Sequence, residues 1–153
     1  MDYATKEATY GIYFWAAYVP CESQHLNAVQ LTLEQVDLIK RLIDKYSQHM
    51  QFAASSTEIL DAHERGRIAS LIGVEGGHSL GSSLAVLRTL YQLGVRYLTL
   101  THTCNTPWAK SSSVEDEEED VLRYNKRRMI GSTFIYLWQR TLPKSLVAVC
   151  SSS

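Results

Sequence analysis

The chain has 153 residues, of which 45% are hydrophobic and 20% charged, and its formal net charge is -1 at pH 7. This length and composition are typical of one globular domain with a buried core. The near-neutral charge argues against a nucleic-acid-binding protein, which needs a basic face. The apolar run MIGSTFIYLW is about half as long as a membrane helix, and the first ten residues lack the pattern of a secretory signal, so neither feature is expected in the chain as written.

The chain begins with a predicted strand and helix. Residues 11–20, GIYFWAAYVP, form an aromatic run that ends at Pro20 and predicts a buried strand. Apolar residues then recur at steps of three and four, which predicts an amphipathic helix over about residues 24–48. Residues 50–54, MQFAA, are expected to form a short strand.

Serines mark the N-terminal ends of two further helices. Glu58 follows Ser55 by three residues, as in a capping box, and predicts a helix over about residues 55–67. Residues 82–94, SSLAVLRTLYQLG, form a helical pattern that begins with serine and ends at Gly94.

Two more strands flank that last helix. Residues 67–77, RIASLIGVEGG, are almost continuously apolar and end in two glycines, as expected of a parallel strand covered on both faces. Residues 95–102, VRYLTLTH, are the next strand. Strands that alternate with helices imply βαβ units and a parallel sheet, so the predicted class is α/β. Chemistry in such folds collects at the carboxyl ends of the strands.

Glu75 and His102 each lie at the carboxyl end of a predicted strand. A carboxylate there is costly to desolvate unless a metal ion, an arginine or backbone N–H groups compensate it. Glu75 is therefore either a functional ligand or a salt-bridged or capping acid, and His102 is either functional or simply hydrogen-bonded at a strand end. His78 could orient the loop after Glu75, whose two glycines are expected to let a ligand approach the backbone. The remaining histidines are expected at the surface: His25, His49 and His63.

The cysteines suggest a covalent link. Cys21 follows the first strand and Cys104 follows the last, so both lie at the same edge of a parallel sheet and could meet. A disulfide there would stabilise the fold by roughly 4 kcal/mol and would imply an oxidising compartment, whereas two buried free thiols are the alternative. The third cysteine, Cys150, has no predicted partner. The chain contains no H-E-x-x-H, C-x-x-C, G-x-S-x-G or glycine-rich phosphate motif.

Several stretches of the sequence resemble one family. They are ASLIGVEGGHSL, SSLAVLRTLYQLGVRYLTLTHTCNTPWA, and YVPC followed by TLEQVDLI. Over about residues 12–109 the chain closely resembles the membrane (renal-type) dipeptidases, which are zinc metallopeptidases of the amidohydrolase-like barrel group. The resemblance implies a (β/α)8 TIM-type barrel and hydrolysis of dipeptides by a water activated between two zinc ions. It also implies an extracellular location on the plasma membrane, a C-terminal lipid anchor and disulfide-linked homodimers.

The resemblance implies a role for four residues. Glu75 matches the carboxylate that bridges the two zinc ions, a position at which its charge is fully compensated. His102 matches the histidine that binds substrate near the reacting carbonyl. Cys21 and Cys104 match the family's intrachain disulfide.

Most of the family's zinc ligands are missing from the chain. No histidine is followed two places on by Asp, so the H-x-D motif is absent, and no histidine follows His102 to supply the two later ligands. Only Glu75 remains of five protein ligands, and one carboxylate cannot hold a binuclear site. We therefore predict a truncated zinc dipeptidase that is inactive in isolation. The alternative is a non-catalytic pseudoenzyme or partner-binding fragment.

The predicted organisation has four parts. Residues 1–11 are a divergent N-terminal segment, and residues 12–109 form a partial barrel of three to four βα units with an exposed sheet edge. Residues 110–128 contain six consecutive acids followed by a basic patch and are expected to be a mobile linker. Residues 129–153 form a divergent tail.

Overall fold

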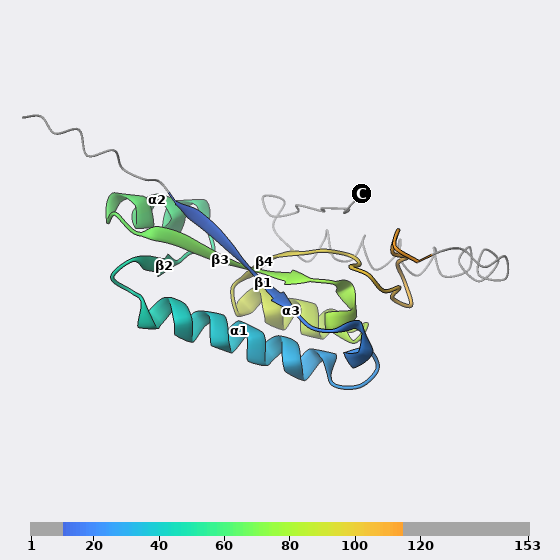
Figure 1. Cartoon of the computed structure of the whole chain (residues 1–153). Helices are drawn as coiled ribbons and strands as arrows, with labels where there is room; N and C mark the ends of the chain where they lie inside the picture. The colour runs from blue at the N-terminus through green and yellow to red at the C-terminus, as the bar shows by residue number, and fades with distance from the viewer. Residues whose placement is uncertain (1–10, 115–153) are drawn as a thin grey trace, which may run out of the picture.

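The computed structural model describes residues 11–114, shown in colour in Figure 1. The predicted tail at 129–153, and most of the predicted segments at 1–11 and 110–128, lie outside the described residues, so their boundaries stay predictions. The elements appear in the order β1 (Ile12–Tyr18), the 3₁₀ turn η1 (Cys21–Ser23), α1 (Ala28–Lys45), β2 (Met50–Phe52), α2 (Ser56–Glu64), β3 (Ile68–Glu75), the 3₁₀ turn η2 (Gly77–Leu80), α3 (Leu84–Gln92) and β4 (Val95–Leu98). The α/β class is confirmed.

β3 is the central strand of a fully parallel sheet. It pairs with every residue of β1, from Ala69 opposite Ile12 to Glu75 opposite Tyr18. Its other edge is shared, because β2 pairs with the start of β3 and β4 pairs with its end. Among the described residues no strand pairs with the outer edge of β1, so the sheet is open there.

Two helices cover one face of the sheet and bury the main core. Residues at steps of three and four on α1 pack against β3, which explains the helical periodicity of the sequence. α3 adds two leucines to the same core, and Figure 1 shows α1 and α3 on the same side of the strands. The buried side chains from these elements are Val36, Ile39, Ile43, Ile72, Val74, Leu87 and Leu90.

On the opposite face of the sheet, the helix packing within residues 11–114 lies towards the amino end of β3. Ala69 and Leu71 of β3 pack with Ala62 of α2 in a second, smaller cluster. Side chains alternate along a strand, so this face continues towards Glu75. The aromatic residue Phe14, which lies opposite Leu71 on β1, is 50% exposed on this face.

Helix ends follow the local chemistry that the sequence predicts. Ser55 Oγ accepts a hydrogen bond from the Glu58 backbone N–H, and the Glu58 carboxylate accepts one from the Ala54 N–H at 2.7 Å. α3 begins after Ser83, whose hydroxyl caps Val86 N. α1 begins later than the expected residue 24, because residues 21–27 form η1 and a turn.

β4 ends at Leu98, before the predicted end at His102. Just beyond it, Thr99 N still donates to the Val74 carbonyl of β3 at 3.1 Å, and residues 99 and 100 also accept hydrogen bonds from the loop after β3. Gly76 N donates to Thr99 Oγ1 at 2.7 Å, and Gly77 N donates to the Leu100 carbonyl at 3.2 Å. The two loops at the carboxyl edge of the sheet are therefore joined.

Candidate functional site

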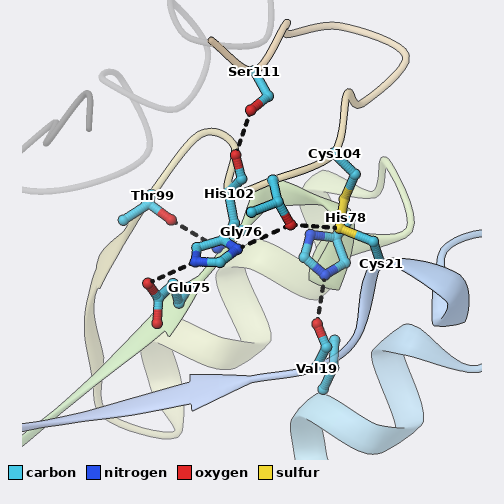
Figure 2. Close-up of polar contacts among 10 residues, drawn as sticks. Val19, Cys21, Glu75, Gly76, His78, Thr99, His102, Cys104 and Ser111 are labelled. Carbon is cyan, nitrogen blue, oxygen red and sulfur yellow. Dashed lines mark hydrogen bonds and ion pairs between the residues drawn. A yellow bond between two sulfur atoms is a disulfide. The ribbon is translucent and has the colours of Figure 1, made fainter. Parts of the chain in front are cut away.

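Glu75 and His102, the two residues singled out from the sequence, contact each other. Glu75 ends β3, and His102 lies in the loop that follows β4. His102 Nε2 lies 3.3 Å from Glu75 Oε1, and the side chains are 34% and 36% exposed, respectively. Figure 2 shows the imidazole turned towards the carboxylate. The fold thus brings a carboxylate and an imidazole together at the carboxyl edge of the sheet, with both still open to solvent.

Tyr18 of β1 is a third member of this site. It lies opposite Glu75 in the strand register, and its ring centroid is 5.0 Å from that of His102. Sequence reasoning missed this residue. The available signal was its place at the carboxyl end of the first predicted strand, the same position that made Glu75 a candidate.

The loop that carries His102 is held by its own side chains. Thr103 Oγ1 lies 3.3 Å from His102 Nδ1 and 3.4 Å from Cys21 Sγ. Ser111 Oγ donates a hydrogen bond to the His102 carbonyl. These contacts fix the backbone and one ring nitrogen of His102, while the other nitrogen faces Glu75.

Cys21 and Cys104 form a disulfide, so they are not free thiols. Their Cα atoms are 5.9 Å apart and 83 positions apart in sequence. The bond joins η1, just after β1, to the loop after β4, as Figure 2 shows. The disulfide therefore links the segments that follow β1 and β4, the two strands that pair with the carboxyl-terminal part of β3. Cys150 lies outside the described residues.

His78 lies behind the site and is only 2% exposed. Its Nε2 is 2.8 Å from the Val19 carbonyl, so the ring ties η2 to the end of β1. This contact fits the expectation that His78 orients the loop after Glu75.

The two glycines after Glu75 serve packing within the protein. Gly76 has φ +101, and a Cβ there would lie 2.4 Å from the His78 ring. A Cβ on Gly77 would lie 2.4 Å from the Leu100 carbonyl oxygen and 2.5 Å from Trp108. The expectation that these glycines leave room for a ligand is therefore wrong at Gly77, because the protein itself fills that space.

The other histidines lie away from the site. His25 and His49 are exposed, as predicted. His63 is half-buried, which corrects the prediction of a surface position, because α2 packs on the sheet through the adjacent, fully buried Ala62.

The described residues do not fit a complete binuclear zinc site. Within residues 11–114, no group of three or more histidine, cysteine or acidic donors includes Glu75. His102 is the donor beside it. A site that binds two zinc ions needs several preorganised ligands. No helix among these residues is long and apolar enough to cross a membrane.

Comparisons with known proteins agree with this architecture. Over 108 residues the chain is 50% identical to dipeptidase 3 of Mus musculus, an alignment that covers 71% of this chain and 21% of the mouse protein. The chain therefore spans about a fifth of the length of that relative. An amidohydrolase from Pseudomonas aeruginosa superimposes with a TM-score of 0.61 at 18% identity, over 76% of this chain and 36% of that one.

A second solved structure, the metallopeptidase dipeptidase AC, superimposes with a TM-score of 0.56 at 16% identity and covers 76% of this chain and 41% of that one. These likenesses show the fold: parallel βα units that match part of a TIM barrel, with the sheet not closed. The family model for membrane dipeptidases matches residues 3–127, a wider span than the 12–109 of the sequence resemblance. The chain belongs to the membrane dipeptidase family, peptidase family M19.

Proposed function

We propose that the chain carries part of the dipeptide-hydrolysing site of its family. In this proposal Glu75 is the carboxylate shared by two zinc ions, and His102 binds the substrate near its reacting carbonyl. The contact between these two side chains at the carboxyl edge of the sheet supports the proposal, since barrels of this class place their chemistry at that edge. Membership of the membrane dipeptidase family supports dipeptides as the substrate class, and the family resemblance supports zinc as the metal.

The surroundings of His102 suit a hydrogen-bond donor. When the Thr103 hydroxyl donates to His102 Nδ1, the neutral ring carries its proton on Nε2, the nitrogen that faces Glu75. A peptide carbonyl oxygen held beside Glu75 would accept that proton in a hydrogen bond, which stabilises negative charge as it develops on the oxygen. The zinc ions, when bound in a complete site, supply the activated water.

The 153-residue chain by itself is proposed to be inactive. Four of the five family ligands are missing from its sequence, and the described residues offer Glu75 no second carboxylate and no further histidine. Homodimers, a lipid anchor and a location on the extracellular face of the plasma membrane belong to the same proposal for the complete family member.

A second candidate is a non-catalytic pseudoenzyme or partner-binding chain. The shortage of ligands around Glu75 favours it, and so does the open edge of β1, which offers backbone groups for pairing with another strand.

A segment exchange tests the proposed roles. Residues 12–109 of this chain replace the matching segment of a full-length relative already shown to bind two zinc ions and to hydrolyse a dipeptide. We expect the chimera to keep both properties, and Glu75→Gln in the chimera to lose zinc, measured by metal analysis, together with hydrolysis. Glu64→Gln, at an exposed helix end, is the matched control and should keep both.

Two outcomes contradict the proposal. Full zinc content in the Glu75→Gln chimera would show that this carboxylate is not a shared ligand. Chelator-sensitive dipeptide hydrolysis by the isolated 153-residue chain would show that it holds a working site without the missing histidines.

A further inference from the structure

A second group of metal-type donors lies beside the Glu75–His102 pair. The donor atoms of Cys21, His78 and Cys104 all lie within 4.8 Å of one another. They come from the segments that follow β1, β3 and β4, three strands whose carboxyl ends meet at this edge. None of these three residues belongs to the family's five zinc ligands, and the family resemblance gives them no metal-binding role.

His78 is oriented as a ligand would be. Its Nε2 lies 2.8 Å from the Val19 carbonyl, so in the neutral ring this nitrogen carries the proton and donates it. Nδ1 is then left with a lone pair. That atom is buried and has no hydrogen-bond partner among residues 11–114. Figure 2 shows it on the side of the ring that faces the disulfide.

A backbone carbonyl that accepts from one ring nitrogen is the usual outer support of a metal-binding histidine, because it fixes both the tautomer and the ring orientation. A buried nitrogen with no partner is otherwise unfavourable. The unpartnered Nδ1, on the side of the ring that faces the disulfide, therefore points to a ligand that the two sulfur atoms could share with it once the S–S bond is broken.

We propose that reduction of the Cys21–Cys104 disulfide creates a Zn²⁺ site made of two thiolates and His78 Nδ1. Sulfur and imidazole donors select zinc over hard cations such as Mg²⁺ or Ca²⁺. Zinc–ligand bonds of about 2.0 to 2.3 Å in a tetrahedron place the donor atoms roughly 3.6 to 3.8 Å apart. The two sulfur atoms are bonded to each other in the disulfide, so after reduction their side chains rotate apart to this spacing, while the His78 donor already lies within 4.8 Å of both. Water fills the fourth position.

The conversion needs a thiol reductant and releases protons. Two equivalents of a monothiol, RSH, break the S–S bond, and each cysteine sulfur gains one electron and one proton while RSSR forms. Zn²⁺ then replaces the two thiol protons, which pass to solvent, and forms two Zn–S bonds and one Zn–N bond. The disulfide and the metal site use the same two sulfur atoms and therefore exclude each other. Either state ties the end of β1 to the loop that carries His102.

Zinc binding and thiol protection test the proposal on the full 153-residue chain. The chain is reduced, freed of reductant under anaerobic conditions and titrated with Zn²⁺ alone. We expect one tightly bound zinc per reduced chain and none at this site in the oxidised chain. Mass spectrometry after brief alkylation should show Cys21 and Cys104 protected by zinc, while Cys150 reacts.

Three variants separate this site from the proposed dipeptidase site. His78→Gln should weaken zinc binding by the reduced chain about tenfold or more. Glu75→Gln and Cys150→Ser should bind as the unchanged chain does. Circular dichroism of each oxidised variant checks that it folds.

Equal alkylation of Cys21 and Cys104 with and without zinc would overturn the proposal, and this result needs no variant. Loss of the zinc in Glu75→Gln, or unchanged affinity in a folded His78→Gln, would also overturn it, since the metal would then lie elsewhere.

Discussion

At the scale of single residues, the site contains two kinds of side chain. Glu75 and His102 are partly exposed and face each other, so they are placed to contact a ligand. His78 contacts the Val19 carbonyl and so holds the loop that follows Glu75. Thr103 contacts Nδ1 of His102 and so holds the imidazole ring. The sequence predicts Glu75 and His102 because each lies at the carboxyl end of a predicted strand. The burial of His78 could not be predicted, since it depends on a carbonyl 59 positions away.

Gly77 illustrates how tightly the holding residues are packed. Gly77→Ala should lower the free energy of unfolding by about 1–3 kcal/mol, because overpacking against backbone cannot be relieved by a rotamer change. The new Cβ would lie 2.4 Å from the Leu100 carbonyl oxygen, in the segment that leads to His102. Urea denaturation followed by circular dichroism gives the free energy.

Gly11→Ala is the matched control for that substitution. Its Cβ would meet the Ile68 side chain, and not backbone, at the longer distance of 3.2 Å, and Ile68 is 38% exposed. We expect a smaller loss than for Gly77→Ala. Equal losses for the two variants would mean that the Leu100 contact does not explain the glycine.

At the scale of elements, the hydrophobic periodicity of the sequence predicts which helices and strands form, but it does not predict the order of the strands in the sheet. The step of three and four on α1 and the apolar run of β3 each predict the observed element. The insertion of β3 between β1 and β2 could not be predicted, because a run of three strand residues in β2 carries no information about its neighbour. The early end of β4 was missed for a related reason: the residues that follow it, 99 and 100, accept hydrogen bonds from Gly76 and Gly77, which are more than 20 positions away in sequence.

The cap of α2 provides a test at this scale. Ser55→Ala removes the hydroxyl that accepts from Glu58 N and contacts the Glu58 carboxylate, and should cost about 0.5–2 kcal/mol. Amide hydrogen exchange should increase first in α2, since the helix has only nine residues. Ser56→Ala, at the next and equally exposed position, should leave exchange unchanged. Equal exchange in the two variants would argue against the cap.

At the scale of the whole molecule, the sheet is a part of a barrel rather than a closed one. The chain spans about a fifth of dipeptidase 3 of Mus musculus, and the described residues leave the outer edge of β1 without a partner strand. That edge also carries aromatic side chains, with Tyr13 53% exposed and Phe14 50% exposed. Open edges of this kind pair with other chains unless a charge, a proline or a covering element blocks them.

We therefore predict that the chain self-associates through β1. Its weight-average mass in sedimentation equilibrium should rise with protein concentration, and Phe14→Lys should shift it back towards the monomer, because a lysine on an edge strand disfavours pairing. Leu26→Lys is the matched control: Leu26 is 82% exposed but lies outside the sheet, so the added charge is the same and association should persist. An equal shift in both variants would mean that the added charge, and not the position on β1, causes the effect. A weight-average mass equal to that of the monomer at all concentrations would show that β1 does not pair between chains.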